Sequence, residues 1–173
     1  WGAWMVAHCW GLILGSVIVF HLWPNPLTFV LAVMVIGSRQ LGLAILMHEA
    51  AHNALFRTRW LNEWAGEWLC GRPIMADLPA YRHYHLTHHR HTQTEKDPDL
   101  RLSKPFPTTR ASLRRKLIRD ITGQTGIKQR AQQIMVAFKF AGDTDDVSAQ
   151  DLAQAFSGPV LGRALLANAV LFA

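Results

Sequence analysis

Five histidines fall into two short clusters with the spacing of a helical metal site. His48 and His52 lie in the segment His-Glu-Ala-Ala-His, and His85, His88 and His89 lie in His-Leu-Thr-His-His. Residues three and four apart are neighbours on one face of a helix. Each cluster therefore aims its imidazoles into one volume, and neutral imidazole is a common ligand of zinc, copper and iron. Five such ligands exceed what one tetrahedral zinc takes from a protein, so the count points to two metal ions.

The first cluster also matches the His-Glu-x-x-His pattern of zinc metalloproteases. In a membrane zinc metalloprotease His48 and His52 would bind zinc, and Glu49 would be the general base. Such a site needs one further protein ligand and an open position for water. Three acids could supply that ligand, although none has a distinctive context: Glu63, Glu67 and Asp77. A single zinc leaves the second histidine cluster unexplained. The membrane zinc metalloprotease is therefore less favoured than a site with two metal ions.

The elements that carry the clusters follow from an uneven distribution of charge. Residues 1–38 contain no Asp, Glu, Lys or Arg. A soluble domain rarely runs so long without charge, because charged residues populate its surface. We therefore predict transmembrane helices over residues 1–23 and 27–47, joined by a Pro-Asn-Pro turn. We expect the second helix to continue through His52 to Phe56, leaving the membrane as it goes.

The charge pattern also predicts the organisation and orientation of the chain. We expect one all-α domain over residues 1–173, with a membrane hairpin, a cytoplasmic histidine-box region at 48–155 and a partial third span at 157–173. Residues 101–130 carry nine Lys or Arg against one acid. The positive-inside rule places this loop, and with it both histidine clusters, on the cytoplasmic side. Because the last apolar run stops at Ala173, we expect the chain to be part of a longer protein.

The basic loop and a tryptophan-rich stretch each have two interpretations. Beside two membrane spans, contact of the loop with anionic lipid head groups is favoured over nucleic-acid binding. Trp60, Trp64 and Trp68 recur at spacing four within residues 57–69. This spacing predicts a helix with stacked tryptophans on one face, lying at the membrane interface. An ordinary amphipathic core helix is the alternative.

The two clusters together resemble the first two histidine boxes of the membrane fatty acid desaturase superfamily. They are separated by 32 residues and follow a predicted hairpin. The segments around them are similar as well, and the resemblance covers nearly the whole chain. These segments are Arg39-Gln40 before the first box, Tyr81-Arg82 before the second, Asp97-Pro98-Asp99 after it, and Asp120 to Gly126 further on.

The resemblance implies a helical membrane fold whose cytoplasmic cap holds two non-haem irons. The iron ligands it implies are His48, His52, His85, His88 and His89. The implied reaction is O2-dependent desaturation of a fatty acyl chain in lipid metabolism, with an acyl lipid or acyl thioester as substrate. Ferredoxin or a cytochrome b5-like protein would donate the electrons. A hydroxylase or ketolase acting on an alkyl, sphingolipid or carotenoid substrate would use the same iron platform and stays an alternative.

The ligand set implied by the resemblance is incomplete in this sequence. The third histidine box of the family is missing, so we expect the chain alone to be inactive. No catalytic residue beyond the metal ligands is expected. Histidine ligands usually donate their other ring N–H to a carboxylate or a carbonyl. The acids near the boxes are Glu49, Asp97 and Asp99.

Overall fold

The structure is a computed structural model that describes residues 1–103, 106–128 and 131. The described residues form helices and connecting turns without a strand, which confirms the predicted all-α class. The predicted third span at 157–173 lies outside them. The helices are α1 (Gly2–Leu22), α2 (Pro26–Ala51), α3 (Arg59–Trp64), the π-helix η1 (Ala65–Gly71), the 3-10 turn η2 (Arg72–Ile74), α4 (Leu78–His91), α5 (Leu100–Ser103) and α6 (Arg110–Ile121).

The described chain divides into two compact units at a point inside α4. Residues up to Arg82 belong to the first unit, which contains α1, α2, α3, η1, η2 and the start of α4. Residues from His83 onward belong to the second unit, which contains the rest of α4, α5 and α6. The boundary does not interrupt α4, which is one continuous helix from Leu78 to His91.

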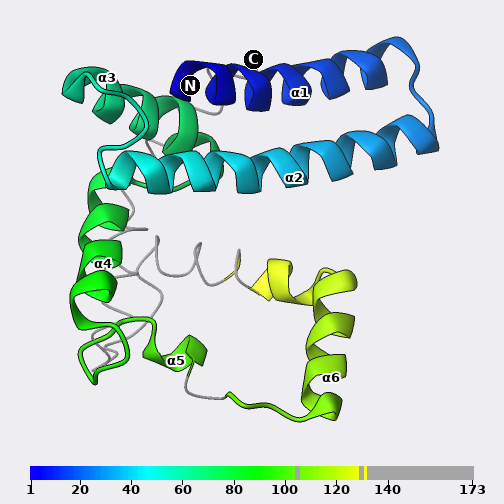
Figure 1. The fold of residues 1–173 in the computed structure, drawn as a ribbon. Helices are drawn as coiled ribbons and strands as arrows, with labels where there is room; N and C mark the ends of the chain where they lie inside the picture. Colours follow the sequence, from blue (N-terminus) through cyan, green and yellow to red (C-terminus); the bar gives the residue numbers. More distant parts are fainter. Residues whose placement is uncertain (104–105, 129–130, 132–173) are drawn as a thin grey trace. The chain divides into compact units, whose positions relative to one another are not determined.

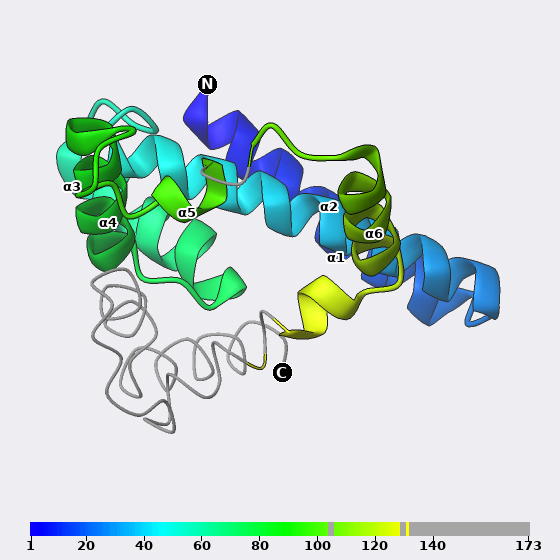
Figure 2. The same cartoon turned by 90° about the horizontal axis from the view of Figure 1, so that it is seen from below.

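The first two helices form an antiparallel hairpin: they run side by side in Figure 1, and α1 lies behind α2 in Figure 2. Both are long and apolar enough to cross a membrane, which confirms the predicted pair of long apolar helices. The turn between them is fixed by Asn25, whose Oδ1 accepts the backbone N–H groups of Leu27 and Thr28 at 3.0 and 3.1 Å. Thr28 Oγ1 accepts the N–H of Asn25 in return, and this reciprocal capping box starts α2.

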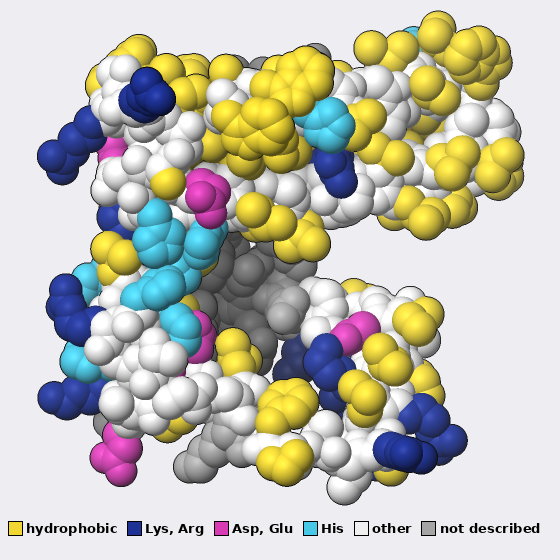
Figure 3. Space-filling view, viewed as in Figure 1, with side chains coloured by type: hydrophobic (Ala, Val, Ile, Leu, Met, Phe, Trp, Pro, Cys, Tyr) yellow, Lys and Arg dark blue, Asp and Glu magenta, His cyan; other side chains and the backbone are white. Residues whose placement is uncertain are grey.

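The outer surface of the hairpin is largely hydrophobic (Figure 3). Large apolar side chains such as Leu27, Met34 and Leu41 are each exposed by about two thirds (67%, 65% and 65%). In water such a surface would be an aggregation hazard, whereas the hydrocarbon of a bilayer solvates it. The surface therefore fits a hairpin inserted in a membrane.

The second helix ends earlier than its sequence predicts. The predicted continuation to Phe56 is wrong, because α2 ends at Ala51 and His52 is its C-cap. Asn53 adopts the left-handed conformation, with φ of 58°, that commonly terminates helices. Its N–H donates to the Ala50 carbonyl at 3.0 Å, and the next N–H, of residue 54, donates to the carbonyl of residue 49 at 2.8 Å. These two bonds are the Schellman pattern, which satisfies the last carbonyls of the helix.

The core of the first unit lies at this same end of the hairpin. It joins α1, α2, η1 and the first residue of α4 through buried side chains: Val6, Cys9, Ile13, Leu43, Leu46, Met47, Ala50, Ala51, Leu55, Cys70 and Leu78. The π-helix packs tightly here, since a Cβ on Gly66 would stand 2.4 Å from the Cβ of Ala50. Both cysteines are free and buried, and burial raises the pKa of the Cys70 thiol to about 12.

The tryptophans of α3 and η1 lie on the exposed side of that packed layer. Trp60 and Trp64 stack with their ring centroids 6.5 Å apart, as the spacing of four predicts. Trp60 is 70% exposed and Trp68 is 43% exposed, whereas Asn62 and Cys70 on the other side are fully buried. Contact of these tryptophans with a membrane interface stays a prediction.

Residues 110–121 of the basic loop form the helix α6 in the second unit. α6 starts at Thr109, whose Oγ1 accepts the Ser112 N–H at 3.2 Å. Within the helix, Lys116 pairs with Asp120 at 2.5 Å, one turn away. None of the α6 residues is buried.

Candidate metal centre

The last turn of α2 places the first pair of histidines. The rings of His48 and His52 lie with their centroids 4.8 Å apart, as expected for residues four apart on one face. The Nδ1 atom of His48 is 3.0 Å from Oε1 of Glu49. This contact fixes the ring orientation and makes Nε2 the nitrogen that would bind a metal ion.

The middle of α4 places the second cluster. His85 and His89 are one turn apart, with ring centroids 4.5 Å apart and their Nε2 atoms 2.9 Å apart. His88 is offset from this pair, with its ring centroid 6.3 Å from that of His85. The three rings therefore share one side of α4, but only His85 and His89 bring ring nitrogens together.

The loop after α4 holds the remaining histidine. Nδ1 of His88 is 2.7 Å from Oδ1 of Asp97, and this hydrogen bond raises the pKa of His88. The Asp97 carboxylate is 5% exposed and also accepts the backbone N–H groups of Gln93 and Asp99 at 2.8 and 2.9 Å. Tyr84 donates a hydrogen bond to Asp99. Asp97 thus lies where a carboxylate can orient the His88 ring from behind.

The N-terminus of α4 is held by two carboxylates and a buried arginine. Oε2 of Glu67 accepts the Leu78 N–H at 2.7 Å, and Oδ1 of Asp77 accepts the Ala80 N–H at 3.0 Å. Both acids also pair with Arg72, which is 2% exposed. Negative charge is favourable at a helix N-terminus, and Arg72 offsets the charge that burial makes costly. Burial raises the pKa of Glu67.

The C-terminus of α2 is held by Asn62 from α3. The Asn62 side chain is fully buried, and its Nδ2 donates to the Ala50 carbonyl at 3.0 Å. Its Oδ1 accepts the N–H groups of Leu55 and Phe56 at 3.1 and 3.2 Å. One amide thus bonds to three backbone groups of the helix end and of the turn that follows it.

Arg82 in α4 bonds to the same helix end. Its Nε donates to the Ala51 carbonyl and its Nη2 to the Ala50 carbonyl, both at 2.9 Å. The guanidinium also makes a two-pronged contact with the Glu63 carboxylate, at 2.7 and 2.9 Å. This hydrogen bond lowers the pKa of Glu63. Arg82 thus links α4 to both α2 and α3 within the first unit.

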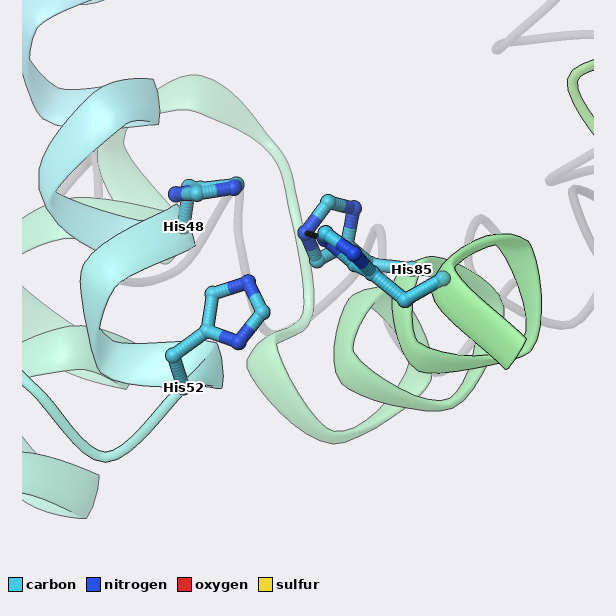
Figure 4. Close-up of side chains that lie close together, drawn as sticks. His48, His52 and His85 are labelled. Atoms are coloured by element: carbon cyan, nitrogen blue, oxygen red, sulfur yellow. Dashed lines mark hydrogen bonds between the residues drawn. The ribbon is translucent and has the colours of Figure 1, made fainter. Parts of the chain in front are cut away.

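The histidines of α2 and α4 converge where Arg82 joins the two helices. One ring nitrogen from each of His48, His52, His85 and His89 lies within 4.8 Å of the others. Figure 4 shows the rings of His48 and His52 turned toward the ring of His85. Four of the five predicted ligands are brought together in this way, and His88 stands outside the group.

The four side chains fit a transition-metal ion. All four donors are imidazole nitrogens, which suit iron, zinc and copper. The 2.9 Å separation of the two Nε2 atoms on α4 matches two neighbouring ligands that each lie ~2.1 Å from one ion. Carboxylates stand behind His48 and His88 and accept from their other ring nitrogens. The chemistry of the donor set is thus that of a metal centre.

The acids considered as a third zinc ligand are engaged elsewhere. Glu63 pairs with Arg82, and Glu67 and Asp77 pair with Arg72. None of the three belongs to the four-histidine group. The supporting roles of Asn62 and Arg82 were not predicted. A single sequence carries no signal for contacts between residues 12 and 32 positions apart.

Comparison with known proteins agrees with this geometry. The sequence profile of the fatty acid desaturase family matches residues 21–172. A similar protein is dihydrorhizobitoxine desaturase of Bradyrhizobium elkanii, which is 37% identical over 81 residues. The aligned segment makes up 46% of this chain and 22% of that protein. No solved structure matches the chain. From the extent of the profile match and from the histidines that the two helices present, the chain belongs to the fatty acid desaturase family.

Proposed function

We propose that the protein carrying this chain is a membrane-bound di-iron oxidoreductase that uses O2 to desaturate a fatty acyl chain. The observation that carries the proposal is the group of four imidazoles, supplied in pairs by α2 and α4. Imidazole ligands and a redox reaction point to iron rather than to a Mg²⁺ or Ca²⁺ site, which would use oxygen donors. The two metal ions would be held by His48, His52, His85, His88 and His89, together with ligands from outside this chain.

Each part of the chain has a distinct role in this proposal. Bound iron would supply the oxidising power needed to break an unactivated C–H bond. The histidines would hold the metal, while Glu49 and Asp97 would fix the orientation of the His48 and His88 rings through Nδ1. The hairpin would keep the centre at the edge of the bilayer, where an apolar chain can approach from lipid.

The proposed orientation places the metal centre on the cytoplasmic side. The basic residues of α6 and its neighbours would face the cytoplasm by the positive-inside rule. Exposed arginines and lysines there suit either anionic lipid head groups or an acidic electron donor such as ferredoxin or a cytochrome b5-like protein.

The substrate assignment rests on the family and on the apolar hairpin. The relative named above acts, by its name, on dihydrorhizobitoxine, so desaturases related to this chain are not restricted to one substrate. A fatty acyl chain is favoured here because the family is that of fatty acid desaturases and because the exposed hairpin surface is apolar. Desaturation is favoured over hydroxylation on the family's name.

Product analysis in lipid tests the proposed reaction. The protein is expressed with its complete reading frame, placed in nanodiscs and supplied with O2 and reduced ferredoxin. Mass spectrometry of the acyl chains is expected to show the loss of two hydrogens. A gain of one oxygen instead would replace desaturation by hydroxylation. Peptide cleavage that requires zinc would overturn the oxidoreductase in favour of the protease.

A matched pair of variants tests whether desaturation depends on the proposed metal ligands. His85→Ala is expected to abolish desaturation because it removes one imidazole from the four-histidine group. His21→Ala removes a histidine in the last turn of α1, outside that group, and is expected to leave the product yield unchanged. Full activity of His85→Ala would contradict the ligand assignment.

A further inference from the structure

Arg82 joins three helices next to the proposed metal ligands. Its two bonds to α2 reach the carbonyls of Ala50 and Ala51, the two residues that precede His52. Its two bonds to Glu63 reach α3. All four bonds lie within the first unit, and they originate from one planar guanidinium whose side chain is 22% exposed.

The position of Arg82 on α4 relates it to the second histidine cluster. His85 and His89 follow Arg82 by three and seven residues, so the three side chains lie along one face of the helix. When Arg82 bonds to the end of α2, it turns that face of α4 toward α2. The orientation of His85 and His89 is thereby tied to the helix that carries His48 and His52.

We propose that Arg82 is a positioning residue of the metal centre, which sets the rotation of α4 and so brings His85 and His89 to face His48 and His52. The inference rests on the proposed function, because it assumes that these four histidines bind iron. Arg82 touches neither substrate nor metal in this account. It acts through the backbone of α2 and through Glu63.

The chemistry of the guanidinium explains why an arginine stands at this position. The helix end offers two carbonyls and α3 offers a carboxylate, and together they need donors that point in fixed directions. Guanidinium supplies five N–H donors in a rigid plane. A lysine ammonium at the same place keeps the positive charge, but as a point charge it cannot hold both carbonyls and both carboxylate oxygens in one geometry. Charge and positioning are therefore separable by experiment.

The test compares Arg82→Lys with a variant that weakens the fold elsewhere. Leu43→Ala truncates a side chain that is 1% exposed in the hairpin core and lies outside the four-histidine group. Both variants and the parent protein are expressed with the complete reading frame in detergent. Fe(II) affinity is measured by titration, the visible spectrum is recorded after Co(II) loading, and thermal unfolding is followed by circular dichroism.

Arg82→Lys is expected to weaken Fe(II) binding by about 10- to 100-fold, the usual cost of disturbing groups behind metal ligands, and to shift the Co(II) spectrum. Leu43→Ala is expected to lower the unfolding temperature while keeping the parent's Fe(II) affinity and Co(II) spectrum. Parent-like metal binding by Arg82→Lys would overturn the positioning role. So would an equal loss of metal binding in Leu43→Ala, because metal binding would then report only stability.

A second variant covers the case in which Arg82→Lys does not fold. Glu63→Gln leaves Arg82 in place and removes only the negative charge that orients the Arg82 guanidinium. The Co(II) spectrum is therefore expected to shift in the same direction as in Arg82→Lys, by a smaller amount. An unchanged spectrum would count against the inference. A parent protein that binds no iron would overturn the proposed function itself, which separates that failure from a failure of the positioning role.

Discussion

Asn62 bonds to the end of α2 and to the turn that follows it. It bonds to the carbonyl of Ala50 and to the N–H groups of Leu55 and Phe56 from a fully buried position. Asn62→Ala would leave buried backbone groups without those bonds, at a cost of about 1–3 kcal/mol of stability. We expect a lower unfolding temperature in detergent, measured by circular dichroism. An unchanged unfolding temperature would show that water replaces the amide at no cost.

The pairing of Glu63 with Arg82 makes the folding stability depend on pH. Arg82 lowers the pKa of Glu63 below the ordinary glutamate value of 4.5. Below pH 4.5 the unfolded chain therefore takes up a proton that the folded chain does not, so this contribution to stability is lost as the pH falls through the folded pKa. The contribution is fully present above the pKa that Glu63 has in the unfolded chain.

Thermal unfolding at pH 6 and pH 4 measures this contribution. The parent protein is expected to lose more stability between the two pH values than Glu63→Gln, which cannot titrate at residue 63. Because the carboxylate is 37% exposed, solvent screens the ion pair and the difference should be small. An identical pH dependence in both proteins would contradict the assigned pairing.

The packing of η1 against α2 leaves no space at Gly66. A Cβ there would stand 2.4 Å from the Ala50 Cβ and 3.0 Å from Leu78 Cδ2. Gly66→Ala would therefore push η1 away from α2 or force the core apart, at a cost of about 1–3 kcal/mol. We expect a lower unfolding temperature, followed by circular dichroism.

Gly37→Ala in α2 is the matched control, and it should not lower the unfolding temperature. A Cβ on Gly37 would meet nothing within 4 Å. Gly37→Ala is expected to keep or slightly raise the unfolding temperature, because alanine is favoured over glycine inside a helix by up to about 1 kcal/mol. Destabilisation by both variants to the same degree would show that close packing at residue 66 is not the cause.

The helices could be predicted from sequence wherever local chemistry determines them. The hairpin follows from the absence of charge over residues 1–38, and the histidine spacing predicts the shared faces of α2 and α4. The end of α2 was placed five residues too late, at Phe56 instead of Ala51, because the left-handed conformation of Asn53 outweighs the apolar pattern. Asparagine tolerates the left-handed conformation, so Asn53 is itself a helix-stop signal that the longer apolar pattern obscures.

The convergence of the two histidine clusters depends on contacts that local sequence patterns do not show. Arg82 and Asn62 fold α3 and α4 back on the end of α2 across long separations in sequence. The resemblance to a family implies five histidine ligands, and four of these five lie together in the structure. The structure adds the physical reason, which is a buried amide and a guanidinium that occupy the carbonyls at the end of one helix.

The described residues combine a hairpin of two long apolar helices with a group of four histidines. The hairpin belongs to the first unit, whose packed end carries His48 and His52. The second unit carries His85 and His89, as well as His88 with Asp97 behind it and the basic helix α6.

The metal content of the protein expressed with its complete reading frame tests this account most directly. Elemental analysis after purification in detergent is predicted to find about two irons per chain and little zinc, as expected for imidazole ligands serving a redox reaction. His52→Ala and His85→Ala should each lower the iron content, since they remove one ligand from α2 and one from α4. One zinc per chain without iron, or an iron content unchanged by both substitutions, would contradict the account.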